Sequence, residues 1–153
     1  MRRLRFWPRA PMEPTAPLAR RRLHRATFLA AGVYNLAWGA LTVLDPQGLF
    51  RWADMEPMRH PAVFACLGMA IGLYGLVYAE IARRPERGFL LAAVGLTGKI
   101  LGPIGWVVQV TQHGWPLSTG VLIVFNDLVW WVPFGLYLWD AWPSYRRDLQ
   151  AGW

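Results

Sequence analysis

The chain has 153 residues, of which 55% are hydrophobic and only 16% are charged, whereas a soluble domain carries roughly 25% charged residues. Its apolar residues gather in four long blocks, which is typical of membrane spans and argues against a water-soluble core. The formal net charge of +7 comes from arginines at the ends and in one short connector. No nucleic-acid-binding motif accompanies these arginines, so we expect no nucleic-acid partner and assign the charge to membrane topology.

The first segment, residues 1–25, is predicted to be a cytoplasmic tail rich in Arg and Pro, because its regularly spaced prolines prevent a helix. A transmembrane domain over residues 26–140 follows. Its four membrane helices are predicted at about 27–44, 62–82, 88–110 and 117–139, each of sufficient length for ~30 Å of hydrocarbon. Residues 141–153 are predicted to form a second cytoplasmic tail.

The arginines predict the orientation of these helices. Eight precede the first predicted span, three lie between the second and third, and two follow the fourth. The two other connectors contain only Arg51 and Arg59, which nearby acidic residues offset. Because basic residues stay on the cytoplasmic side, we predict an all-α, polytopic four-transmembrane-helix bundle with both termini inside. Four arginines beside the first span are expected to hold anionic lipid head groups: Arg20, Arg21, Arg22 and Arg25.

Strongly polar residues interrupt three of the four apolar blocks. Asn35 lies in the first span, Lys99 in the third and the Asn126-Asp127 pair in the fourth, all near the bilayer midplane. A charge there costs about 2.5–3.5 kcal/mol on insertion scales, and a facing Lys99–Asp127 pair would relieve that cost. Lys99 is the only lysine in the chain. An amine that is able to lose its proton is therefore indicated at this depth.

Prolines and glycines add to this layer. Pro103 frees the main-chain carbonyl of Lys99, and Pro133 frees that of Val129, so both are predicted to kink their helices. In membrane proteins such broken helices often line binding sites. Two small-residue motifs predict close helix packing: Gly68-x-x-x-Gly72 and Gly98-x-x-x-Gly102.

Three interpretations of the polar layer remain open. It is a structural ion pair that locks the helices, a site for a ligand, proton or substrate, or a pair that faces a partner subunit. His24, His60 and His113 lie near the interfaces and Cys66 is the only cysteine, so no metal site is predicted. No nucleophile–base arrangement is evident, and the balance is against an enzyme.

Three segments carry a resemblance to a known group of proteins: Tyr34-Asn35-Leu36-Ala37-Trp38-Gly39, Gly98-Lys99-Ile100-Leu101-Gly102-Pro103, and residues 126–134, Asn-Asp-Leu-Val-Trp-Trp-Val-Pro-Phe. Over residues 27–139 the chain resembles small, mostly uncharacterised bacterial four-helix membrane proteins that are loosely DoxX-like. The resemblance implies the four-span fold and a multi-pass protein of the bacterial cytoplasmic (inner) membrane. Some DoxX-like proteins are small subunits of quinone-linked redox enzymes.

We therefore predict an integral membrane accessory or binding protein. It is either a small subunit of a membrane complex or a binder of a lipophilic molecule at the midplane. The alternatives are a small membrane enzyme on a lipid-like or quinone substrate, with Lys99 and Asp127 as its acid–base pair, and a proton-coupled transporter. No cofactor is evident, with lipid or quinone as the candidate ligand. Expected partners are membrane lipids and a larger membrane complex or a second copy of the chain.

Overall fold

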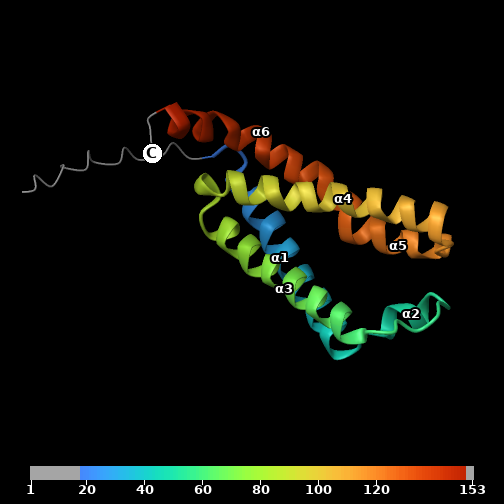
Figure 1. Cartoon of the computed structure of the whole chain (residues 1–153). Helices are drawn as coiled ribbons and strands as arrows, with labels where there is room; N and C mark the ends of the chain where they lie inside the picture. Colours follow the sequence, from blue (N-terminus) through green and yellow to red (C-terminus); the bar gives the residue numbers. More distant parts are fainter. Residues whose placement is uncertain (1–17, 151–153) are drawn as a thin grey trace, which may run out of the picture.

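A computed structural model describes residues 18–150 of the chain. Four helical segments in it are long and apolar enough to cross a membrane, which confirms the prediction of an all-α multi-pass membrane protein (Figure 1). The elements, in chain order, are α1 (Arg21–Leu44), α2 (Gly48–Trp52), α3 (Pro61–Arg83), η1 (Pro85–Arg87), α4 (Phe89–His113), η2 (Leu117–Thr119), α5 (Gly120–Ile123), η3 (Val124–Leu128) and α6 (Val129–Gln150). The fourth membrane segment comprises η2, α5, η3 and α6. Most of the predicted tail over residues 1–25 lies outside the described part.

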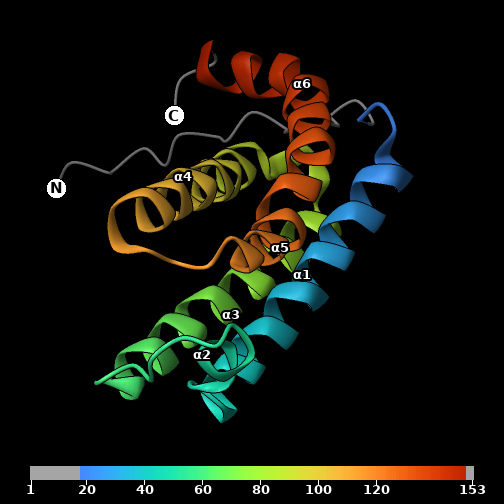
Figure 2. The same ribbon diagram turned by 90° about the vertical axis from the view of Figure 1, so that its right-hand side faces the viewer.

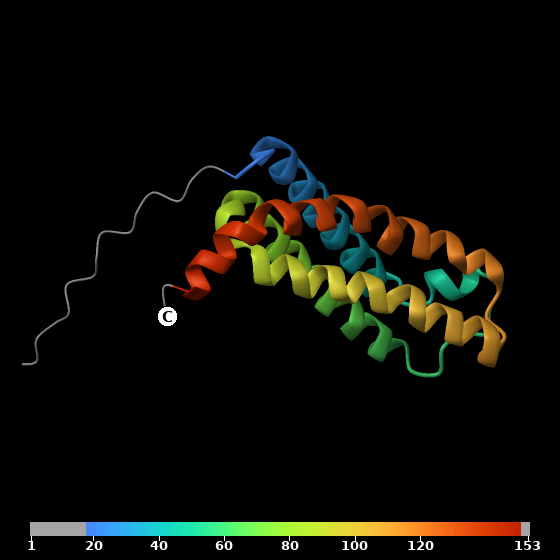
Figure 3. The same ribbon diagram turned by 90° about the horizontal axis from the view of Figure 1, so that it is seen from above.

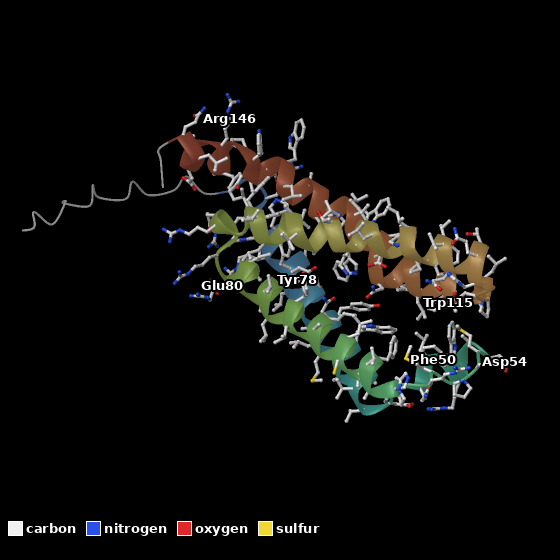
Figure 4. All side chains as sticks on the ribbon, viewed as in Figure 1. Phe50, Asp54, Tyr78, Glu80, Trp115 and Arg146 are labelled. Carbon is white, nitrogen blue, oxygen red and sulfur yellow. The ribbon has the colours of Figure 1, made fainter. Side chains whose placement is uncertain are left out.

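The membrane helices form two pairs. The first pair, α1 and α3, and the second pair, α4 with α5 and α6, meet at one end and diverge toward the other (Figure 1). Seen from above, α4 and α6 lie over α1 and α3 (Figure 3). We call the closed end, which carries the start of α1, η1 and the end of α6, the inner end. Glu80 and Arg146 lie there, whereas Phe50, Asp54 and Trp115 lie at the outer end (Figure 4). Both ends of the described chain are thus on one side, as the predicted orientation requires.

Glycines bring the two helices of the first pair into backbone contact. A Cβ atom on Gly39 would lie 2.6 Å from the Gly68 carbonyl oxygen and 2.7 Å from Gly72 Cα. One on Gly75 would lie 2.7 Å from the Gly32 carbonyl oxygen. The motif at residues 68 and 72 therefore packs α3 against α1 as predicted.

The hydrophobic core occupies the inner half of the bundle. Four fully buried aromatic side chains contact one another there: Phe28, Tyr78, Phe134 and Tyr137. They come from α1, α3 and α6, and the Tyr137 hydroxyl also donates to the Pro85 carbonyl oxygen at 2.7 Å. This cluster joins the two helix pairs.

Two helices extend beyond their predicted limits. α1 begins at Arg21 rather than near residue 27, and α6 continues to Gln150, although a tail was predicted from residue 141. Tertiary contacts explain the longer α6. Asp140 binds Arg20 and His24, and Tyr145 stacks on Phe89 with ring centroids 4.3 Å apart. Hydropathy alone ends the span where apolar residues end, but these contacts hold the helix together farther on.

Candidate binding site at the bilayer midplane

The fourth membrane segment changes its helical geometry where its polar residues lie. Val124–Leu128 form a π-helix, η3, between the α-helical turns of α5 and α6. Such bulges are rare and frequently occur at functional sites. Asp127, in η3, is 4% exposed, and its carboxyl packs against α4 at Gly102. A Cβ atom on Gly102 would lie 2.9 Å from Asp127 Cγ, so the glycine makes room for the carboxyl.

Lys99 is buried in α4, but its partner differs from the one that the sequence predicted. Its ammonium donates to the main-chain carbonyl oxygen of Asn126 at 2.5 Å. Within residues 18–150, no ion pair of 4.0 Å or less joins Lys99 to Asp127. The facing pair that the sequence suggested is therefore not a direct ion pair in this part of the chain. A π-helix alters the main-chain hydrogen bonding of its turn, and here a carbonyl of that turn accepts from the lysine.

Asn126 contributes its side chain as well as its carbonyl. The Asn126 amide nitrogen donates to Asp127 Oδ1 at 3.0 Å. Its own side-chain oxygen is buried and has no hydrogen-bond partner in the described part of the chain. Lys99, Asn126 and Asp127 thus form one connected polar group, which leaves an acceptor unused.

Two tryptophans, Trp130 and Trp131, contact this group, although neither was among the predicted site residues. Trp131 Nε1 donates to the Lys99 carbonyl oxygen at 3.0 Å, so the acceptor that Pro103 frees does find a partner. The Trp130 ring centroid lies 5.8 Å from Lys99 Nζ, within reach of a cation–π interaction. Trp130 also donates to the Phe125 carbonyl oxygen at 3.1 Å. Tryptophan is enriched at membrane interfaces, so two adjacent tryptophans in mid-span were a usable signal.

Pro133 lies inside α6, as Pro103 lies inside α4. For the Val129 carbonyl, which Pro133 frees, the described residues offer no side-chain donor. The consequences of the two prolines therefore differ. The carbonyl that Pro103 frees in α4 accepts a hydrogen bond within the site. Within the described residues, no hydrogen bond joins the carbonyl that Pro133 frees in α6 to the polar group.

Asn35 lies apart from the other polar residues. It is 4% exposed, and its amide nitrogen donates to the Ile71 carbonyl oxygen at 3.3 Å, which links α1 to α3. No donor among residues 18–150 reaches its side-chain oxygen. The four polar residues predicted for one layer therefore divide between the helix pairs: three are joined in the second pair, and Asn35 belongs to the first.

One aromatic contact connects the site to the first helix pair. The rings of Tyr34 and Trp130 have centroids 5.8 Å apart. Among the ring contacts and hydrogen bonds between residues 18 and 150, this is the outermost that joins the two pairs, because the others involve the inner core. Trp130 therefore lies between Lys99 and Tyr34, and it links the site to α1.

The predicted head-group arginines have different surroundings. Arg20 binds Asp140 through two hydrogen bonds of 2.9 and 2.6 Å, and Arg21 donates to Glu86 at 2.5 Å. Their guanidinium groups thus tie α1 to α6 and to η1. Arg22 and Arg25 are exposed, and their role with lipids stays a prediction.

Comparison with known proteins adds nothing to this geometry. No protein-family model matches the chain, and neither a curated protein nor a solved structure matches it. Among the described residues, no group of three or more His, Cys, Asp or Glu side chains is placed to hold a metal ion. The residues of the site alone therefore indicate its chemistry.

Proposed function

We propose that this multi-pass membrane protein binds a lipophilic molecule whose polar group reaches Lys99 and Asn126 at the bilayer midplane. The observation that carries the proposal is the incomplete hydrogen bonding of a buried amine. Lys99 is 5% exposed, and within residues 18–150 its amine has one hydrogen-bond partner, a main-chain carbonyl rather than a carboxylate. If Lys99 only locked helices together as an ion pair, a carboxylate would accept its hydrogen bonds.

The unused hydrogen-bonding capacity defines the ligand chemistry. An ammonium has three donors, and only one of those on Lys99 is used. Asn126, whose main-chain carbonyl accepts from this amine, also has a side-chain oxygen that no donor among residues 18–150 reaches. Unsatisfied polar groups cost several kcal/mol each in lipid. A ligand would remove that cost if it accepted a hydrogen bond from the Lys99 amine and, in one of its own chemical states, donated one to the Asn126 side-chain oxygen.

A quinone meets these requirements. Its carbonyl accepts a hydrogen bond, and the hydroxyl of the reduced form donates one. The flat ring also suits the aromatic surroundings of Trp130, Trp131 and Tyr34.

The test measures saturable binding of a short-chain benzoquinone to the protein in lipid nanodiscs, with empty nanodiscs subtracted. We expect one site, and Lys99→Met should weaken binding at least tenfold, since the donor is removed while the stem is retained. Thr97→Val is the matched control. Thr97 lies on the same helix, is exposed and bonds only the Ala93 carbonyl, so this variant should bind normally.

Three results would overturn the proposal. The wild type binds no more quinone than empty nanodiscs, Lys99→Met binds as tightly as the wild type, or Thr97→Val loses as much affinity as Lys99→Met. Circular dichroism and gel filtration of each variant separate a lost site from a lost fold.

The bacterial inner membrane and a role as small subunit of a larger complex belong to the same proposal. They are supported by the arginine distribution and by the motifs that resemble DoxX-like proteins. Purification from native membranes in mild detergent tests the second point. Larger proteins in fixed stoichiometry would support it, and a stable isolated monomer would contradict it.

A further inference from the structure

The end of α6 forms a basic pocket at the inner end of the bundle, away from the midplane site. The pocket is open, has a volume of about 350 Å³ and is lined by Trp142, Pro143, Arg146, Arg147 and Gln150. We propose that it binds the phosphate group of an anionic phospholipid of the adjacent leaflet. The binding of quinone at the midplane plays no part in this inference.

The pocket has a fixed position relative to the bundle. Asp140, just before it, is held by Arg20 and His24. Beyond Asp140, the end of α6 turns across the bundle (Figure 2). Within this end, Tyr145 stacks on Phe89 at the start of α4, with ring planes 16° apart. Trp142 contacts the same phenylalanine, at 5.6 Å between centroids. The segment is thus anchored where the membrane helices end, at the depth of lipid head groups.

The two arginines of the pocket have no acidic partner. Neither Arg146 nor Arg147 forms an ion pair with any of residues 18–150. Arg147 donates to the Ser144 hydroxyl at 3.3 Å. Other arginines at this end are engaged, Arg20 with Asp140 and Arg21 with Glu86. The pocket therefore offers two guanidinium groups to an external anion.

The lining matches a phospholipid better than a soluble anion. Guanidinium groups bind phosphate oxygens through paired hydrogen bonds, whereas the indole of Trp142 and the ring of Pro143 provide an apolar wall for the lipid's glycerol and upper acyl carbons. Tryptophan is favoured at this depth because one side is apolar and the other wet. The carboxyl end of α6 carries about half a negative charge. Two full positive charges outweigh it.

The experiment measures retention of short-chain phosphatidylglycerol by the full-length protein in detergent, using native mass spectrometry, with phosphatidylcholine as the neutral comparison. We expect one tightly retained phosphatidylglycerol, and R146Q/R147Q should lower its retention at least fivefold. R83Q/R84Q is the matched control. It removes the same charge at the same end, from exposed arginines at the end of α3 that pair with Glu80 and lie outside the pocket, so retention should fall less than twofold.

Each alternative outcome is distinct. Equal losses in the two double variants would mean diffuse attraction to basic residues and would overturn the pocket. Equal retention of phosphatidylcholine would overturn the requirement for an anion. Displacement of the lipid by millimolar inorganic phosphate would indicate a soluble-anion site and would also contradict the proposal. Helical content measured by circular dichroism confirms that the variants are folded.

Discussion

The contact between α1 and α3 at Gly39 yields the sharpest stability prediction. In Gly39→Ala, the new Cβ atom would lie 2.6 Å from the Gly68 carbonyl oxygen, whereas ordinary van der Waals contact begins at 3.4 Å. The obstructing atoms belong to backbone, so no side-chain rotation relieves the clash. The two helices must separate by several tenths of an ångström, which loosens packing along their whole shared face.

The magnitude follows from two opposing effects. Alanine favours a helix over glycine by roughly 0.5–1 kcal/mol, while overpacking a close contact costs typically about 1–3 kcal/mol. Gly98→Ala shows the first effect alone, because nothing lies within 4 Å of the Cβ position there. Both variants gain the same helix propensity, so their difference is the packing cost. We expect Gly39→Ala to be about 1–3 kcal/mol less stable than Gly98→Ala.

The assay is unfolding by SDS in mixed micelles, followed by circular dichroism and evaluated as the free energy of unfolding. If neither variant is destabilised and their stabilities agree within about 0.5 kcal/mol, the close packing of α1 on α3 is refuted. Equal destabilisation of both variants would instead show that Gly98 is covered, which contradicts its open surroundings in the monomer.

Two further predictions concern the inner end. Burial raises the pKa of the Glu86 carboxyl. The hydrogen bond from Arg21, a hydrogen bond from its own main-chain amide and nearby positive charge lower the pKa by more, so that it lies below the ordinary 4.5. Ionised Glu86 therefore stabilises the fold above about pH 4.5, and the contribution disappears as pH falls through the folded-state pKa; Glu86→Gln should flatten this dependence in SDS unfolding, and an unchanged slope would contradict it. Asp140→Ala leaves His24, 1% exposed, without its hydrogen-bond partner, which should cost about 1–3 kcal/mol, whereas Asp148→Ala on the exposed end of α6 should change stability by less than about 0.5 kcal/mol in the same assay.

Much of the fold was predictable because membranes impose strong rules. Hydrophobic length and arginine placement are read directly from the sequence, and the four spans were located on that basis. The ends of α1 and α6 were not, because tertiary contacts extend them. His24 illustrates the reason: it was assigned only to an interface, but its partner, Asp140, is distant in sequence.

The polar site was predictable as a set of residues at one depth but not as a geometry. Counting along each span placed Asn35, Lys99, Asn126 and Asp127 at one depth, and hydrogen bonds join the last three. Which atoms meet depends on the rotation of each helix, and the π-helix changes that rotation locally. No periodicity in the sequence announces such a turn. The lysine therefore meets a carbonyl oxygen where a carboxylate was expected.

The two glycine motifs show how one pattern serves different physical ends. In Gly68-x-x-x-Gly72 both glycines face α1, and the motif brings two backbones together. In Gly98-x-x-x-Gly102 only the second glycine is covered, and its neighbour is the carboxyl of Asp127 rather than a backbone. A glycine that accommodates a buried polar side chain positions that side chain. The second motif thus belongs to the midplane site. It brings α4 and η3 together because Gly102 leaves room for the Asp127 carboxyl.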